Sequence, residues 1–137
     1  MTLHKTQVRV RYQETDQMGV VYYANYFVYF EIGRTDLLRN IGMPYSELEK
    51  EEFFLAVFEA YCKYKAPARY DDLLIVRTWI SKVKYARIEI GYEIWRDNEK
   101  QLVVEGNTTL ACLDKEGKPR LIPDKLMKLL KLELETD

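Results

Sequence analysis

The sequence predicts an α+β fold in which one long helix lies on a face of an antiparallel sheet. Two observations carry this prediction. Residues 24–41 form an apolar segment with helical spacing, and four later segments are rich in β-branched and aromatic residues. The chain has 137 residues, which predicts a single domain over residues 1–137. A short amphipathic helix over residues 123–135 is expected to end it.

The first half of the chain contains one predicted strand and two predicted helices. Apolar and polar side chains alternate over Val8–Tyr12, which predicts a strand, and a polar loop closed by a glycine follows at residues 13–19. The long helix is expected from Ala24 to Ile41, with Gly42 at the position typical of a helix C-terminal glycine. A shorter helix is expected over residues 45–51.

The second half is predicted to consist mainly of strands. In the segment from residue 87, isoleucines and a tyrosine alternate with charged residues, so one face of that strand should be buried. Because the long helix is hydrophobic over most of its surface, we expect the sheet to curl around it. The predicted strands are Phe54–Phe58, Leu73–Val76, Arg87–Ile94 and Gln101–Leu113.

Composition excludes several classes of protein. Hydrophobic residues make up 47% and charged residues 31%, which excludes a disordered chain. The 21 Lys and Arg balance 22 Asp and Glu, which argues against a main role in binding nucleic acid or an anionic membrane. Neither a bilayer-spanning apolar run nor a secretory signal is visible, so a cytoplasmic protein is expected.

The cysteines and the histidine indicate no metal or redox site. Cys62 and Cys112 lie in apolar, strand-like segments, and together with the single histidine, His4, they cannot complete a four-ligand zinc site. We interpret both cysteines as small buried hydrophobic residues without a disulfide. His4 has no organised partner among its neighbours, so catalysis by a histidine triad is not expected.

The segment from Tyr12 to Tyr26 places a loop with carboxylates directly before the long apolar helix. A helix start presents unpaired backbone N–H groups and a partial positive charge. No Ser, Thr or Asp stands at the capping position near Tyr23, and Asn25 is the only local candidate. Such a start can bind an external oxygen, for example a thioester carbonyl that becomes an oxyanion. Asp16 is close enough to fold back toward it, but composition alone favours an ordinary turn residue, because Asp is common in turns.

The same segment, together with Phe30-Glu31 and Arg34, resembles the 4-hydroxybenzoyl-CoA thioesterase family of hotdog-fold proteins, and within it the YbgC-type acyl-CoA thioesterases. The resemblance implies a five-stranded antiparallel sheet wrapped around the central helix. It also implies homodimers with the active site at the interface, paired into homotetramers. Further matches lie at residues 66–72, 111–114, 118–119 and 122–123, so the resemblance spans nearly the whole chain.

Carried over residue by residue, the resemblance makes Asp16 the catalytic aspartate, as nucleophile or general base. Tyr23 matches the residue whose backbone N–H polarises the thioester carbonyl. The YbgC-type branch often has a histidine here, and a phenol cannot replace an imidazole base near neutral pH, so we expect the Tyr23 side chain to be a pocket wall. The departure affects the expected substrate preference more than the reaction. Gly19, Val21 and Tyr22 are expected to bind substrate beside them.

Coenzyme A needs cationic residues for its phosphates, and it is part of the substrate, so no cofactor is expected. The candidates are Arg69, before the third predicted strand, and Lys82, Lys84 and Arg87, around the turn into the fourth. For each of them the alternative is an ordinary exposed surface charge.

Two other carboxylates compete with Asp16. Glu31 lies about eight residues into the helix, roughly 12 Å along its axis, which is too far to share a carbonyl at the helix start. Its expected role is instead to pair with Arg34 or with a residue of the sheet. Glu14 is close to Asp16 in sequence and stays open as an alternative.

The predicted function is therefore acyl-CoA thioester hydrolysis. Two alternatives remain. One is a hotdog module that binds an acyl thioester or a protein without turnover, and the other is an acyl-carrier-protein thioesterase. A hotdog dehydratase would need a histidine paired with a carboxylate on the helix, and His4 is misplaced for that role.

Overall fold

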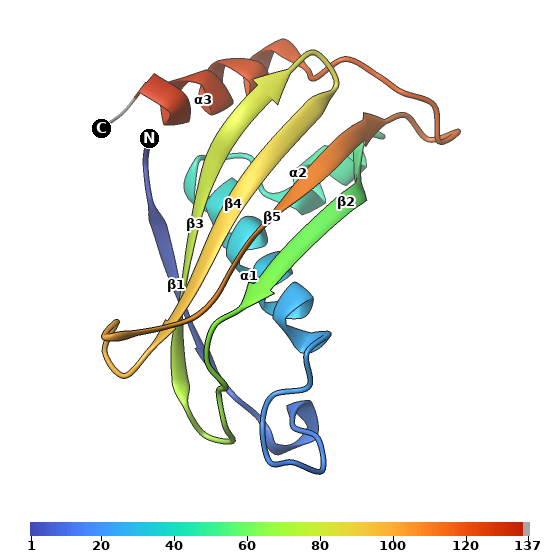
Figure 1. Cartoon of the computed structure of the whole chain (residues 1–137). Helices are drawn as coiled ribbons and strands as arrows, with labels where there is room; N and C mark the ends of the chain where they lie inside the picture. The colour runs from blue at the N-terminus through green and yellow to red at the C-terminus, as the bar shows by residue number, and fades with distance from the viewer. Residues whose placement is uncertain (136–137) are drawn as a thin grey trace.

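The computed structural model describes residues 1–135 and has the predicted α+β architecture (Figure 1). Its helices are α1 (Asn25–Asn40), α2 (Tyr45–Lys50) and α3 (Asp124–Glu135), and a 3₁₀ turn covers Tyr12–Glu14. The strands are β1 (His4–Arg9), β2 (Phe54–Tyr64), β3 (Leu73–Lys84), β4 (Arg87–Arg96) and β5 (Gln101–Leu113).

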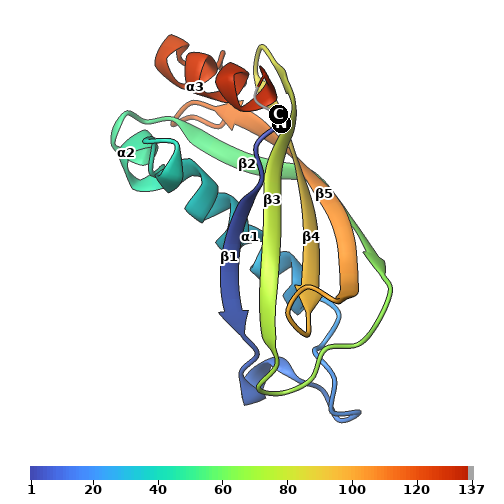
Figure 2. The same ribbon diagram turned by 90° about the vertical axis from the view of Figure 1, so that its left-hand side faces the viewer.

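The five strands form one antiparallel sheet in the order β1-β3-β4-β5-β2. The sheet curves around α1, which lies against one face, while α3 crosses one end of the sheet (Figure 2). Helix α1 packs mainly against β1 and β3. Strand β2 is the edge strand opposite β1, so it lies on the side of the sheet away from the strands on which α1 mainly packs.

The core between helix and sheet follows the predicted alternation of β4. Its side chains Ile88, Ile90, Tyr92 and Ile94 are all buried and point toward α1. The Tyr92 ring stacks on Phe30 of α1, with ring centroids 4.2 Å apart and planes within 9° of parallel. This contact anchors the middle of the helix to the centre of the sheet.

A glycine allows the close approach of α1 to β3. A Cβ added at Gly33 would lie 2.3 Å from Oγ1 of Thr78 and 2.9 Å from Cγ1 of Val76, closer than any side chain tolerates. The helix therefore touches the sheet with its backbone at this point, and this contact fixes the position of the α1 start relative to the strands.

Three predicted strands differ from the observed ones, and one of them, β3, runs to Lys84 instead of ending at Val76. The first strand is displaced toward the N-terminus, to His4–Arg9, because the backbone N–H of Arg11 donates to the Glu14 carboxylate (2.8 Å) and the chain turns there. Strand β2 runs to Tyr64, well beyond the predicted Phe58. Its outer half is exposed and lacks clean alternation, so pairing with β5 rather than a local pattern defines it.

The cysteines and the histidine lie in structural positions. Cys112 is buried and Cys62 is half-buried, and both are free thiols. The Nε2 atom of His4 contacts the Glu133 carboxylate of α3, a partner distant in sequence that the neighbours of His4 did not predict. Among residues 1–135, no helix combines the length and the apolar character needed to cross a membrane.

Candidate active site

The loop that carries Asp16 is closed by its own backbone. The N–H of Asp16 donates to the Val20 carbonyl (2.9 Å), and the N–H of Gly19 donates back to the Asp16 carbonyl (3.0 Å). Gly19 has φ +79°, the conformation that glycine adopts without strain. Val20 also forms a β-bridge with Arg69, and Val21 forms one with Thr15, so the loop is held against the segment before β3.

Asp16 is half-buried and lies beside residues at the start of α1. Its Oδ1 atom accepts a hydrogen bond from the Met18 N–H (2.9 Å), while Oδ2 has no protein partner within residues 1–135. Asp16 lines a cavity of about 740 Å³ that also includes Tyr22 and Asn25 from the helix start. The sequence predicted this juxtaposition, and the cavity leaves one carboxylate oxygen available to a bound molecule.

The helix start is uncapped, as the sequence predicts. Ala24 occupies the N-cap position and makes no side-chain cap. In the described part of the chain, the backbone N–H groups of Tyr23 and Ala24 donate no hydrogen bond. Asn25, the only local capping candidate, instead uses its amide to donate to the Glu14 carbonyl (2.8 Å). Two backbone donors are therefore free beside the Asp16 loop.

Glu14 has a different environment from Asp16. Its residue surface is only 8% exposed. The carboxylate accepts hydrogen bonds from Arg11 and from the Tyr29 hydroxyl (3.0 Å). Burial, followed by this contact with Glu14, raises the pKa of Tyr29, so the phenol stays protonated and keeps donating. The Glu14 backbone carbonyl also accepts from the Tyr22 N–H (2.9 Å). Glu14 thus braces the loop against the helix start.

Tyr22 and Tyr23 present exposed rings at the mouth of the site. Their centroids are 4.8 Å apart. The hydrogen bond of the Tyr22 hydroxyl with Tyr23, with smaller effects that include the charge of Asp16, raises the pKa of Tyr22. The Tyr23 ring lies edge-on to Tyr64 of β2 and is not among the residues that line the Asp16 cavity. The ring therefore lies outside the Asp16 cavity of one protomer, and its expected role as a pocket wall stays a prediction.

The candidate phosphate-binding cations are divided between two ends of the protein. Arg69 lies beside the Asp16 loop through its bridge with Val20. Lys82, Lys84 and Arg87 lie at the β3–β4 turn, at the opposite end of the sheet (Figure 1). There they line a cavity of about 200 Å³, and the Arg87 guanidinium stacks over Phe58, 4.9 Å from the ring centroid. Since α1 spans about 24 Å between these ends, one protomer does not bring the two sets together.

The predicted pairing of Glu31 with Arg34 is absent. No ion pair joins them in the portion of the protein that the structure describes, although both line a cavity of about 230 Å³. Arg34 instead lies close enough to the buried Tyr92 hydroxyl for its charge to act on that phenol. The stacking of α1 on the sheet turns Arg34 inward, which helical spacing alone could not reveal.

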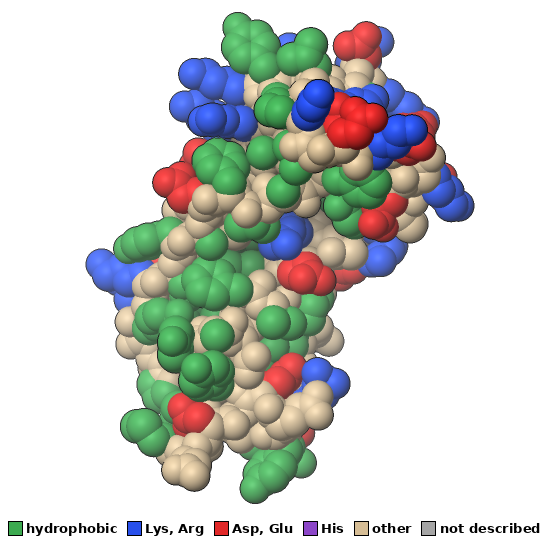
Figure 3. Space-filling view, turned by 90° about the vertical axis from the view of Figure 1, so that its right-hand side faces the viewer, with side chains coloured by type: hydrophobic (Ala, Val, Ile, Leu, Met, Phe, Trp, Pro, Cys, Tyr) green, Lys and Arg blue, Asp and Glu red, His purple; other side chains and the backbone are tan. Residues whose placement is uncertain are grey.

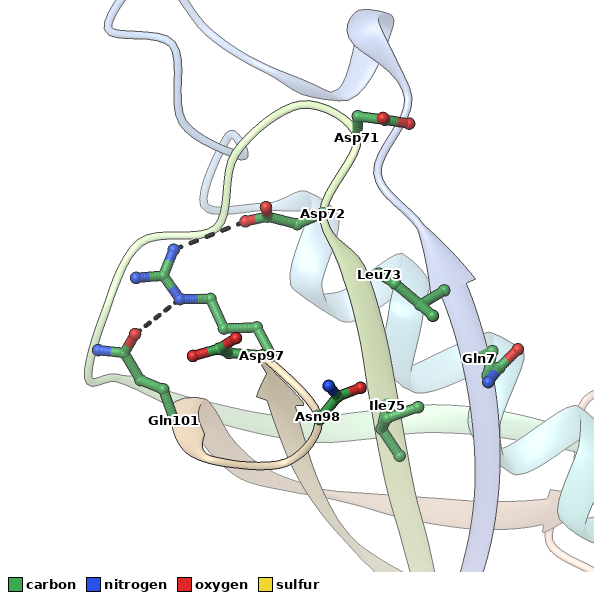
Figure 4. Close-up of a pocket in the computed structure, with 9 residues that line it drawn as sticks. Gln7, Asp71, Asp72, Leu73, Ile75, Asp97, Asn98 and Gln101 are labelled. Carbon is green, nitrogen blue, oxygen red and sulfur yellow. Dashed lines mark hydrogen bonds and ion pairs between the residues drawn. The ribbon is translucent and has the colours of Figure 1, made fainter.

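Another cavity, of about 510 Å³, lies beside the β4–β5 turn (Figure 4). It is lined by Asp71, Asp72 and Asp97, and its arginine, Arg96, already pairs with Asp72 (3.6 Å). It contains none of the predicted site residues. Among residues 1–135, no cluster of three or more His, Cys, Asp or Glu is arranged to hold a metal ion.

Sequence reasoning missed one residue of the site. The hydroxyl of Tyr64, at the end of β2, donates to the Tyr23 carbonyl (3.2 Å). No local pattern could have indicated it, because 41 residues separate the two tyrosines. Only the sheet order and the curvature of β2 toward the helix start bring them together.

Comparisons with known proteins show the family to which the chain belongs. Residues 10–130 match the family model described as the thioesterase-like superfamily. The chain belongs to this superfamily. It is also similar to the YneP protein of Bacillus subtilis (strain 168), with 38% identity over 117 residues that cover 85% of this chain and 84% of that protein.

Two further thioesterases place the chain within the superfamily. The acyl-CoA thioester hydrolase YbgC of Escherichia coli O157:H7 is 33% identical over 127 residues, covering 92% of this chain and 94% of that protein. The crystal structure of the DHNA-CoA thioesterase from Staphylococcus aureus superposes with a TM-score of 0.89 and 28% identity, covering 98% of this chain and 92% of that one. The predicted hotdog fold and the resemblance to YbgC-type thioester hydrolases are therefore confirmed.

Proposed function

We propose that this thioesterase-like protein hydrolyses acyl-CoA thioesters to a free acid and coenzyme A. One observation carries the proposal: Asp16, with its unpaired Oδ2, lines one cavity with Tyr22 and Asn25, the residues on either side of the uncapped Tyr23–Ala24 start of α1. Hydrolysis of a thioester needs a nucleophile or base and a stabiliser for the oxyanion. Asp16 in this cavity and the free N–H groups beside it supply the two. The names of the relatives support the same substrate class.

The thioester carbonyl oxygen would bind at the N–H of Tyr23, where the partial positive charge of the helix start stabilises the oxyanion. In one route, the Asp16 carboxylate bonds to the carbonyl carbon and the C–S bond breaks. Coenzyme A then leaves as a thiolate, and water hydrolyses the mixed anhydride. In the other route, Asp16 takes a proton from a water that attacks the same carbon. Both routes place the same demand on Asp16, an ionised oxygen facing the carbonyl.

A homodimer would complete the site. Strand β2 is an edge whose unpaired backbone groups are available to a second strand. Val57 on β2 (44% exposed), together with Val28 and Ile32 on α1, leaves apolar side chains uncovered on this side. Figure 3 faces it and shows hydrophobic side chains gathered along it. Burial of such a patch against a second copy is the usual role of an exposed apolar surface.

Antiparallel pairing of two β2 strands about a two-fold axis reverses one protomer relative to the other. The β3–β4 turn of one copy, with Lys82, Lys84 and Arg87, then lies at the same end as the Asp16 loop of its partner. The two sets of residues that a single protomer keeps apart would thereby serve one coenzyme A, with Arg69, Gly19 and the other loop residues on the first copy. Pairing of two dimers into a tetramer and a cytoplasmic location complete the proposal, which requires no cofactor.

Steady-state hydrolysis of short, long and aromatic acyl-CoAs and acyl-carrier-protein substrates tests the function. Turnover of at least one acyl-CoA supports it. Turnover of acyl-carrier-protein substrates alone identifies the alternative thioesterase, and binding of acyl-CoA without turnover identifies a binding module.

Complementation tests the shared site. We expect Asp16→Asn and Arg87→Glu homodimers each to have low activity. In a mixed dimer, one of the two sites combines an intact Asp16 with an intact Arg87. Co-refolding equal amounts makes about half of the dimers mixed, so activity should rise toward about a quarter of the wild-type value. A mixture that stays inactive, while size-exclusion chromatography shows mixed dimers, would contradict the shared site.

A further inference from the structure

The free N–H groups at the start of α1 belong to two peptide planes, and the carbonyl of each plane is held. The peptide that carries the Tyr23 N–H also carries the Tyr22 carbonyl, which accepts from the Asn25 N–H (2.9 Å). The next peptide carries the Ala24 N–H and the Tyr23 carbonyl, which accepts from the Tyr64 hydroxyl (3.2 Å). Because a peptide is planar, fixing the direction of its C=O also fixes the direction of its N–H.

The two holding contacts differ in origin. The one from Asn25 is part of the turn that leads into the helix, so any sequence with this backbone would form it. The one from Tyr64 reaches across from the edge strand β2 and depends on a single side chain. A hydrogen bond to the carbonyl also polarises the peptide and strengthens its N–H as a donor.

The surroundings of Tyr64 keep its hydroxyl in place. Its ring contacts the rings of Tyr23 and Tyr26, with centroids 6.3 and 5.7 Å away. The residue is 46% exposed, but its inner side lies beside Cys62. Burial of the hydroxyl end, followed by the adjacent Cys62 thiol, raises the pKa of Tyr64 to about 12, so the phenol is a donor at every pH at which the enzyme would work.

We propose that Tyr64 is a positioning residue of the oxyanion site: its hydroxyl orients the Tyr23–Ala24 peptide so that the Ala24 N–H is a second donor beside that of Tyr23. This inference rests on the proposed thioesterase function. The edge strand then has a role in catalysis as well as in assembly, because a shift of the β2 end would turn this peptide and weaken the oxyanion site.

Tyr64→Phe removes the donor and keeps the ring. We expect kcat and kcat/KM to fall together by about fivefold, the size of effect that one neutral hydrogen bond supplies, with KM unchanged. Tyr61→Phe is the matched control. Tyr61 is on the same strand, its side chain points to the opposite face, and its hydroxyl makes no hydrogen bond in the described structure, so its loss should leave kcat unchanged.

A direct reading of the hydrogen bond separates positioning from a general structural effect. The sequence contains two Tyr-Ala peptides, Tyr23–Ala24 and Tyr85–Ala86. Labelling of tyrosine carbonyls with ¹³C and of alanine amides with ¹⁵N therefore gives two NMR correlations. The Tyr85 carbonyl accepts from the Ile122 N–H (2.8 Å), far from the site, and is an internal control.

In Tyr64→Phe we expect the Tyr23–Ala24 correlation to move and the Tyr85–Ala86 correlation to stay. An unchanged kcat in Tyr64→Phe overturns the inference, and so does a fall in kcat with both correlations unmoved. If the wild-type protein hydrolyses no thioester, the proposed function fails, while the two correlations still report whether Tyr64 holds this peptide.

Discussion

The two ends of α1 differ in whether their backbone N–H groups have hydrogen-bond acceptors. At the C-terminal end, the N–H groups of Ile41, Gly42 and Met43 all donate to carbonyls of the last helical turns, and Gly42 adopts φ +93° to allow this. At the N-terminal end, no side chain caps the helix, and the N–H groups of Tyr23 and Ala24 stay free in the described structure. The C-terminal end is therefore capped, which stabilises the helix, whereas the N-terminal end keeps two backbone donors free.

The difference indicates where this protein accepts a cost in stability. A suitable cap contributes about 1 kcal/mol to a helix, so the uncapped start gives up a gain that one Ser or Asp could supply. Asp16 lines a cavity with Tyr22 and Asn25, on either side of that start. We therefore expect substitutions at the N-terminal end to change kcat with little change in stability, and substitutions along the rest of the helix to do the reverse.

Asp16→Asn tests the N-terminal end and should have the largest effect on kcat. The substitution keeps the size of the side chain and removes its charge, so kcat should fall about 100-fold or more, as for other positioned acid–base groups. The urea midpoint should stay close to that of the wild type, because only one carboxylate oxygen accepts a protein hydrogen bond, from Met18. Asp97→Asn, on the exposed β4–β5 turn, is the control for loss of a surface carboxylate. Equal activity of Asp16→Asn and wild type would make Asp16 a turn residue and direct attention to Glu14.

Gly33→Ala sharpens the comparison at the middle of the helix. The added methyl group would meet Thr78 at 2.3 Å and Val76 at 2.9 Å, so we expect a loss of about 1–3 kcal/mol in the free energy of unfolding measured with urea. Thr78→Ala in the same chain should recover part of that loss. Since an alanine otherwise favours a helix over glycine, a stabilised Gly33→Ala variant would show that α1 does not sit this close to β3.

Gly42→Ala tests the capped C-terminal end of α1. Nothing lies within 4 Å of a Cβ at this position, so the cost comes only from the positive φ. We expect about 1 kcal/mol of destabilisation in urea and an unchanged kcat. Gly42→Asn should cost less, because asparagine tolerates the left-handed region better than alanine does. A large fall in kcat in either variant would break the proposed division between the two ends.

Tyr23→Phe should have the smallest effect. The backbone N–H is retained and only the phenol hydroxyl is lost, so kcat should remain within about twofold of the wild type in the acyl-CoA assay, the scatter expected when no hydrogen bond to substrate is removed. A tenfold or greater loss would instead assign the Tyr23 hydroxyl a role in proton transfer or in binding, and the helix start would then act through a side chain as well as through its backbone.

Local sequence was sufficient for most of the fold. The bounds of α1 and β5, the buried face of β4 and the positive φ of Gly42 follow from side-chain periodicity and from glycine, which act over a few residues. The predicted end of the first strand, at Tyr12, was wrong, because the buried carboxylate of Glu14 turns the chain at Arg11. A carboxylate in a polar loop gives no sign that it will be buried.

The sequence by itself determined the two components of the candidate site, Asp16 and an uncapped helix start, because both belong to one continuous segment whose spacing keeps them close. Only the tertiary structure decided what surrounds them. The hydroxyl of Tyr64 reaches the Tyr23 carbonyl, and Lys82 and Arg87 lie at the far end of the protomer. These placements depend on the order of the strands and the curvature of the sheet, which arise from packing between residues far apart in the chain and leave no trace in local pattern.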